Sequence, residues 1–300
     1  MTRDTLLLVG LSDERHPELI ARASQVAEAL GLRIYAYFPV PDSRLAAAIS
    51  HPSAPITHVL EDSFKRYCDE LQSTLETLAA LGRDVDGRVE WRRSPASAVL
   101  NVVREIEPRL VMLAPKPHDR VAEIFLSDDD FELIRLCRVP IWLVRRFPEQ
   151  HGTVLAAVDP THDDDREFAI DHAVLTESCA LARSLGKRVM AIHAVSAPTS
   201  SLRLAEAGGR RPAIYEHERA HAYRTHQLRE LTRLHGIPDE DLHVVDGQLV
   251  DVVEAALEPL DVDFVVIGAL SRTRVRRMFV GGTAEELLRC VTTDLLVVKQ

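Results

Sequence analysis

The residues best suited to bind a ligand form a glycine-rich loop near the end of the chain. Gly268 begins this loop, Ser271 follows it, and Gly281-Gly282-Thr283 comes nine residues later. Glycines let a ligand approach the backbone, and Thr283-x-x-Glu286 has the spacing of a capping box at a helix start. Free N–H groups at a helix N-terminus attract anions. The loop therefore predicts a phosphate site, and the alternative is a tight turn into a capped helix.

The same stretch of sequence occurs twice, and only the second copy has the glycines. Residues 82–144 match residues 236–298 at a constant offset of 154 (236 minus 82), without a gap. The first copy has Ala114 and Pro117 at the start of its loop, and Ser127-Asp128-Asp129 at its end. Carboxylates at a helix start satisfy the free N–H groups and repel phosphate. We therefore expect no nucleoside triphosphate in the first copy.

Short apolar strands alternate with helices in both halves, which predicts parallel sheets with crossover helices. We expect an α/β fold of two tandem, doubly wound, five-stranded domains of Rossmann-like type, over residues 1–146 and 152–300. A short polar linker joins them, and they are expected to pair as an internal pseudo-dimer. Strands are predicted at 6–9, 34–38, 88–91, 110–113, 141–144, 154–158, 188–194, 242–245, 264–267 and 295–298. Helices are predicted at 17–30, 58–81, 95–106, 129–137, 165–185, 214–235, 248–258 and 283–290.

Composition excludes several classes of protein. The formal net charge is −10, which argues against non-specific binding of nucleic acid. The four cysteines have no CxxC spacing and are typical of reduced thiols. The sequence has neither a signal peptide pattern nor an apolar run long enough to span a membrane. We expect a cytoplasmic protein that contacts no membrane.

Several histidine and aspartate clusters have spacings that resemble metal or catalytic sites. His217-Glu218-x-x-His221 matches a zinc motif on a predicted helix, but no third ligand follows at a suitable spacing. The runs Asp128–Asp130 and Asp163–Asp165 are typical of helix starts, with Mg²⁺ binding as the alternative. His193 has no visible nucleophile partner. The sequence therefore predicts neither a catalytic residue nor a metal site.

The tandem repeat, the order of elements and the loop resemble the universal stress proteins, and the two-domain length resembles their tandem, E-type branch. Nucleotide-binding members of that family have a G-x-x-G-x(9)-G-[S/T] loop, an Asp after the first strand and a Gly after the third. The resemblance implies ATP or a related adenine nucleotide, accompanied by Mg²⁺, in the second domain only. It assigns the base to Asp159 and Val195, the ribose to Gly247, and the phosphates to Gly268, Ser271, Arg272, Gly281, Gly282 and Thr283.

The resemblance implies a stress-response regulator with, at most, weak nucleotide hydrolysis. Its expected partners are the nucleotide, an unidentified protein and a second copy of the chain. The alternative is a non-nucleotide adaptor or small-molecule carrier with a vestigial loop. Ser271 and Gly282 favour that alternative, because the family loop has Gly and Ser/Thr at those places.

Overall fold

The computed structural model describes residues 4–10, 16–41, 55–92, 94–114, 128–147, 152–161, 165–195, 210–269 and 282–299. Strands and helices alternate along these residues, as an α/β fold requires. Contacts divide them into two compact units, which are described separately below. The first unit contains residues 4–147 together with Asp294–Val297. The second contains residues 152–269, 282–293 and 298–299.

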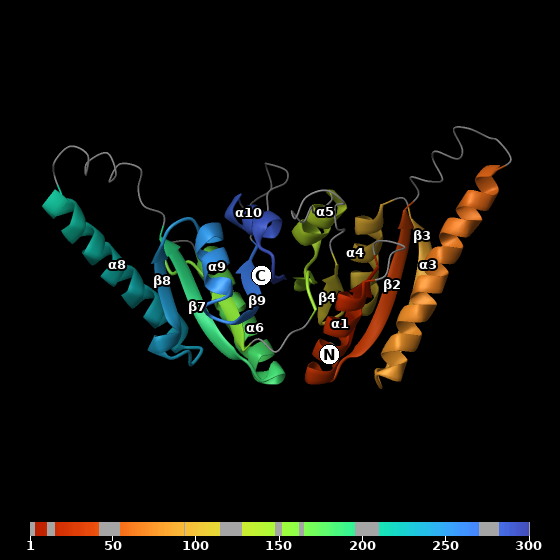
Figure 1. The fold of residues 1–300 in the computed structure, drawn as a ribbon, viewed down its shortest axis with the longest axis horizontal. Helices are drawn as coiled ribbons and strands as arrows, with labels where there is room; N and C mark the ends of the chain where they lie inside the picture. Colours follow the sequence, from red (N-terminus) through yellow and green to blue (C-terminus); the bar gives the residue numbers. More distant parts are fainter. Residues whose placement is uncertain are drawn as a thin grey trace. The chain divides into compact units, whose positions relative to one another are not determined.

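The first unit has a parallel sheet with the strand order β3-β2-β1-β4-β5. Figure 1 labels three of these strands, β2, β3 and β4, beside the helices of the unit. Helix α1 packs against α3 and α4 against α5, and in a doubly wound sheet such pairs cover opposite faces. Its strands are β1 (Thr5–Val9), β2 (Arg33–Pro41), β3 (Val85–Arg92), β4 (Leu110–Leu113) and β5 (Ile141–Leu143). Its helices are α1 (Pro17–Leu30), α3 (Pro55–Ala80), α4 (Pro95–Ile106) and α5 (Asp128–Leu136).

One strand from the end of the chain joins this first unit. β10 (Asp294–Val298) pairs antiparallel with β5, with Leu295 beside Leu143 and Val297 beside Ile141. The indole Nε1 of Trp142 donates to Asp294 Oδ2 at 3.0 Å. The contacts therefore group most of β10 with the first half of the sequence.

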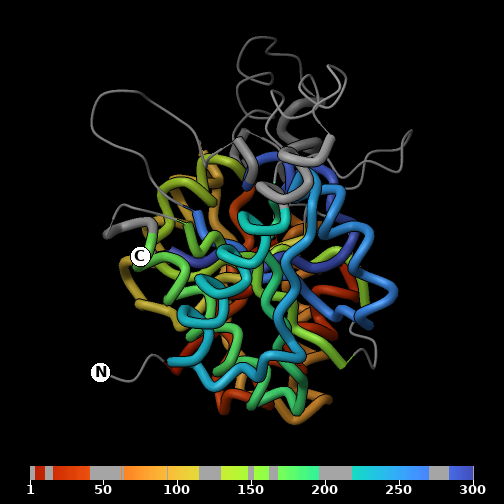
Figure 2. The backbone as a smooth tube through the Cα atoms, turned by 90° about the vertical axis from the view of Figure 1, so that its left-hand side faces the viewer, coloured from red at the N-terminus to blue at the C-terminus, as the bar shows by residue number. Residues whose placement is uncertain are grey.

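The second unit repeats the arrangement with the strand order β9-β6-β7-β8, all parallel. Helix α8 packs against β8, and Figure 2 shows this helix in cyan in front of the strands of its unit. The strands are β6 (Thr153–Ala157), β7 (Arg188–Val195), β8 (Leu242–Asp246) and β9 (Val262–Gly268). The helices are α6 (Asp165–Leu185), α8 (Arg210–Arg233), the short 3₁₀ helix η1 (Asp239–Asp241), α9 (Leu249–Leu257) and α10 (Gly282–Cys290).

Local sequence explains these elements. Strands β1, β4 and β6 are buried at every position, which suits a parallel sheet covered on both faces. Helix α1 begins with Pro17 and ends at Gly31, whose φ of 64° is left-handed. Ser94 caps α4, since its Oγ accepts from Ser97 N at 3.2 Å. The predicted α/β fold is confirmed, and among the described residues the short helix η1 was not predicted from the sequence.

The strand registers show that the two units do not repeat at one constant offset. Strands β4 and β9 keep the offset of 154, because Met112 pairs with Leu8 and Val266 with Ala156. Strands β3 and β8 are offset by 155 (242 minus 87), one residue more. In the first unit Leu8 of β1 pairs with Ala36 of β2, which pairs with Gly87 of β3. In the second unit the corresponding residues on β6, β7 and β8 are Ala156, Ala191 and Leu242. By this register Phe38 is equivalent to His193, and Arg92 to Gly247.

Among the described residues, no helix is both long and apolar enough to cross a membrane.

Candidate functional site

The described candidate residues of the second unit lie at one edge of its sheet. Asp159 follows β6, Val195 ends β7, Gly247 follows β8 and Gly268 ends β9. These four strands are parallel neighbours, so their carboxyl ends share that edge. The chain crosses from β8 back to β9 on the far side of β6, which makes the β6–β9 boundary a switch point. In open α/β sheets, ligands bind at such a point, beyond the carboxyl ends.

Val195 and Gly247 are in direct contact at this edge. The N–H of Gly247 donates to the carbonyl oxygen of Val195 at 3.0 Å. Gly247 has a φ of +146°, which side-chain-bearing residues rarely adopt, and an added Cβ would lie 3.0 Å from Val252 Cγ2. Glycine is therefore required here by both conformation and space.

Asp159 is held by its own loop while its side chain is 43% exposed. Its Oδ1 accepts from Thr161 N at 3.1 Å and from Thr161 Oγ1 at 2.7 Å. Its backbone N–H donates to Oδ1 of the buried Asp171 at 3.1 Å. These bonds fix the turn after β6 and present a carboxylate to the edge of the sheet.

His193 is a further residue of this edge, and the sequence analysis assigned it no partner. It lies on β7 and is 5% exposed. Its Nδ1 is 3.2 Å from Val158 O and 3.6 Å from Asp159 Oδ1. The sequence places His193 near the end of the strand beside β6. Its position relative to Asp159, however, depends on the pairing register of β6 and β7, which the sequence alone does not determine.

The glycine loop is described only at its ends. Gly268 allows α6 to pack closely, since an added Cβ would lie 2.7 Å from Ile170 Cγ1. Gly282 is the first residue of α10, so Thr283 lies inside the first turn. The capping-box prediction for Thr283 is therefore wrong, because an N-cap residue precedes the helix. Ser271, Arg272 and Gly281 lie outside the described residues.

The same correction applies to the first unit. Helix α5 begins at Asp128, one residue before the predicted start at residue 129, so Asp129 lies inside its first turn. Asp128 stands at the position equivalent to Gly282, at the offset of 154. The first residue of this helix is thus acidic where the second unit has a glycine, and the helix dipole favours acidic residues at helix N-termini.

In the first unit, an aromatic ring covers the end of β1. Gly10 N donates to Tyr37 O at 3.0 Å, and Val158 N donates to Ile192 O at 3.1 Å. Gly10 is therefore equivalent to Val158, and the residue equivalent to Asp159 is the next one along the chain. A Cβ on Gly10 would lie 2.3 Å from the ring of Phe38. A cavity beside them has a volume of about 10 Å³, room for about one water molecule.

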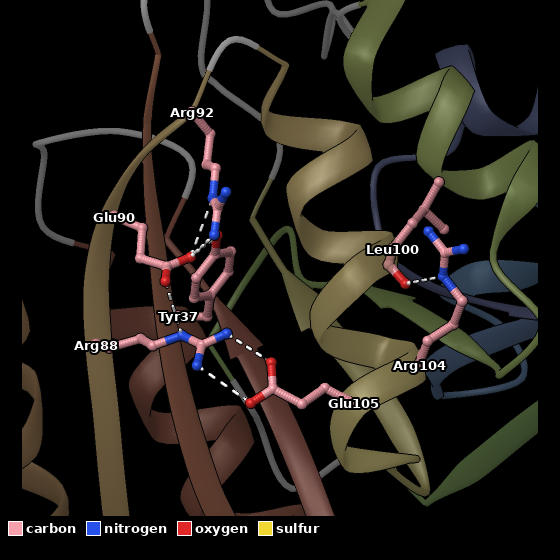
Figure 3. A network of polar contacts seen from close by, with 7 residues as sticks. All are labelled: Tyr37, Arg88, Glu90, Arg92, Leu100, Arg104 and Glu105. Atoms are coloured by element: carbon pink, nitrogen blue, oxygen red, sulfur yellow. Dashed lines mark hydrogen bonds and ion pairs between the residues drawn. The ribbon is translucent and has the colours of Figure 1, made fainter.

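Ion pairs occupy the end of β3 in the same unit (Figure 3). Arg92 is equivalent to Gly247, and its Nη2 lies 2.7 Å from Glu90 Oε2. Tyr37 donates to the same oxygen at 3.0 Å. Burial and this hydrogen bond to Glu90 raise the pKa of Tyr37 to about 12. Arg88 forms a bidentate ion pair with Glu105, in which Nη2 donates to Oε2 at 2.7 Å and Nη1 donates to Oε1 at 3.2 Å. The first unit thus has the Arg92–Glu90 ion pair at the position where the second unit has a glycine without a side chain.

The histidines of the His217-Glu218-x-x-His221 motif lie on α8, as predicted. His221 Nε2 lies 3.1 Å from the carbonyl oxygen of Val244 and donates to it. The side chain of His217 lies outside the described residues. Across the part of the chain that the structure describes, no three His, Cys, Asp or Glu side chains are grouped to hold a metal ion.

Comparison with known proteins identifies the family. Residues 151–299 match the profile of the Universal stress protein family. Universal stress protein E of Photorhabdus laumondii is 26% identical over 305 residues, covering 99% of this chain and 95% of the relative. Universal stress protein E of Escherichia coli K12 is 24% identical over 302 residues, covering 100% of this chain and 94% of the relative. The chain belongs to the universal stress protein family.

Solved structures agree with this fold for a universal stress protein of tandem length. A functionally unknown protein from Pseudomonas aeruginosa PAO1 superposes with a TM-score of 0.73 at 20% identity, covering 99% of this chain and 93% of its own. A universal stress protein from Archaeoglobus fulgidus gives 0.68 at 13% identity, covering 100% and 99%. Full-length coverage by relatives named Universal stress protein E agrees with the tandem branch that the sequence predicted.

Proposed function

We propose that the second unit binds one adenine nucleotide, ATP or a related compound, at the carboxyl edge of β6, β7, β8 and β9. The observation that carries the proposal is the convergence of Asp159, Val195, Gly247 and Gly268 on that edge, from four neighbouring strands. The residues come from places far apart in the sequence.

The chemistry of the edge suits the two ends of a nucleotide. An ionised carboxylate only accepts hydrogen bonds, so Asp159 suits the amino group of adenine. Gly247 has no side chain where the ribose would lie. Helix α10 begins at Gly282, and the N–H groups of its first turn would receive phosphate together with Gly268, Ser271, Arg272, Gly281 and Thr283.

The first unit supports a single site per chain. Its equivalent positions have Phe38 over Gly10, Arg92 bound to Glu90, and Asp128 at the start of α5. A side chain, an ion pair and a negative charge each disfavour a nucleotide there. We expect nucleotide occupancy of the second unit to act as a signal in a stress response, with no catalytic residue assigned.

The test is the nucleotide content of the purified chain, read by mass spectrometry after denaturation, followed by calorimetric titration with ATP. Asp159→Ala should weaken ATP binding at least tenfold. The matched control is Glu258→Gln, which removes an exposed charge at the opposite end of α9 in the same unit. Equal affinity in the wild type and in folded Asp159→Ala would contradict the assignment of the base. Absence of ATP binding in the wild type would favour the adaptor or carrier alternative.

A further inference from the structure

The buried imidazole of His193 has a defined proton position. Its Nδ1 faces two oxygen atoms, Val158 O at 3.2 Å and Asp159 Oδ1 at 3.6 Å. Neither a carbonyl oxygen nor an ionised carboxylate has a proton to donate, so Nδ1 must be the protonated nitrogen. At 5% exposure, the ring is held by the packing of β7. The N–H of His193 therefore donates to Val158 O and also faces the Asp159 carboxylate, in a direction that is set before any ligand arrives.

The Oδ1 atom of Asp159 is surrounded by donors. Two hydrogen bonds come from Thr161, at 3.1 and 2.7 Å, and Nδ1 of His193 approaches the same oxygen to 3.6 Å, an electrostatic contact that is longer than a hydrogen bond. Thr161 lies two residues after Asp159 in the same turn, whereas His193 belongs to the neighbouring strand. The N–H of His193 is thus the positively polarised group of the sheet that faces the carboxylate.

A fixed carboxylate discriminates between purine bases better than a mobile one. Adenine presents a 6-amino donor, whereas hypoxanthine presents a 6-oxo acceptor at the same place. A carboxylate held toward that position loses its partner when the donor is absent, and a site of this kind rejects the analogue. A carboxylate that turns freely can face water instead, so it discriminates less.

The first unit provides an internal comparison. At the position of His193 it has Phe38, which has no donor and whose ring takes the space above Gly10. The unit proposed to bind nucleotide thus has a polar contact between His193 and Asp159. The unit proposed to bind none has the apolar ring of Phe38 at the equivalent position.

We propose that His193 is a positioning residue that orients Asp159 and so sets the preference of the second unit for a 6-aminopurine over a 6-oxopurine. This inference rests on the proposed nucleotide site. It assigns His193 to base selectivity and not to the binding of phosphate.

The experiment is calorimetric titration of the full chain with ATP, with inosine triphosphate and with inorganic triphosphate. His193→Leu removes the donor at similar volume, and His193→Asn keeps an N–H near the position of Nδ1. We expect the wild type and His193→Asn to prefer ATP over inosine triphosphate. His193→Leu should lose at least tenfold of that preference while its affinity for inorganic triphosphate is unchanged.

Two outcomes separate the inference from the proposed function. An ATP preference that is the same in folded His193→Leu and in the wild type would overturn the role of His193 and leave the site intact. Absence of ATP binding in the wild type would overturn both. A measurement independent of folding in the variants is the ¹⁵N NMR spectrum of the wild-type imidazole. It should report a proton on Nδ1, and a neutral ring protonated on Nε2 alone would overturn the inference.

Discussion

Arg22 of α1 and Asp294 of β10 form a fully buried ion pair, with 3.0 Å between Nε and Oδ2. The carboxylate also accepts from Trp142 Nε1 at 3.0 Å and from the backbone N–H groups of Arg145 and Arg146 at 2.9 and 3.2 Å. Burial raises the pKa of Asp294, while Arg22 and these donors lower it. The carboxylate of Asp294 therefore connects β10 to α1, to β5 and to the backbone that follows β5.

Replacing Asp294 by Ala should destabilise the protein by about 3–5 kcal/mol, because it leaves the Arg22 charge buried without its partner. The measurement is urea unfolding followed by circular dichroism. Glu105→Gln is the matched control, since it breaks the exposed pair with Arg88 and should shift the midpoint far less. Equal midpoints for the two variants would show that the buried pair has no special weight.

A fragment ending at residue 146 should fail to remain a stable monomer. It retains β5 but lacks β10, so the edge formed by Ile141, Trp142 and Leu143 loses its antiparallel partner. Exposed apolar strand edges lead to pairing with other chains. Light scattering after gel filtration should show dimers or larger species. A monodisperse, cooperatively folded monomer would argue against this account and against the expected pseudo-dimer of the two halves.

Acid should weaken the second unit through a pair of histidines. His172 Nδ1 and His235 Nε2 lie 2.8 Å apart, and burial together with His172 lowers the pKa of His235 below its ordinary value of 6.5. The unfolded chain then binds a proton more readily than the folded one, so stability is full above pH 6.5 and falls as the pH drops through the lowered pKa. The melting temperature should fall between about pH 7 and pH 5 less steeply in His235→Gln than in the wild type. The control is His226→Gln, a change at an exposed histidine of the same unit, which should keep the wild-type dependence of melting temperature on pH. The same dependence in His235→Gln as in the wild type would refute the explanation.

Gly247→Ala should lower both stability and ATP affinity. Its φ of +146° and the approach of Val252 Cγ2 to 3.0 Å predict about 1–3 kcal/mol of strain. Gly236→Ala is the control, because Gly236 also has a positive φ, of +71°, but ends α8 with no atom near its Cβ position. Both variants should melt earlier, and only Gly247→Ala should bind ATP at least tenfold more weakly. Similar ATP affinity in the two would remove Gly247 from the site.

Much of the fold could be predicted because its causes are local. Glycines such as Gly31 and Gly236 mark helix ends, and continuous apolar runs mark buried strands. The starts of α5 and α10 were placed one residue late, since Asp129 and Thr283 resemble caps in sequence but lie inside the first turn. A cap is defined by backbone conformation, which residue type favours but does not determine.

The site was predictable only in part, for a different reason. Asp159 and Gly247 stand at strand ends, where family resemblance and strand order both place ligands. The roles of His193, Phe38 and Arg92 depend on strand register, and one added residue after β3 shifts the two repeats relative to each other. Neither the contact of His193 with Asp159 nor the equivalence of Arg92 and Gly247 can be read from a constant offset.

The central claim, one nucleotide per chain in the second unit, is tested most directly by titration calorimetry of ATP into the wild type and Gly282→Asp. This change copies Asp128 of the first unit, and an aspartate in the first turn should maintain the stability of α10. We predict one site per chain in the wild type and at least tenfold weaker binding in the variant, about 1.4 kcal/mol. Two sites per chain, or unchanged affinity in a folded Gly282→Asp, would contradict the account.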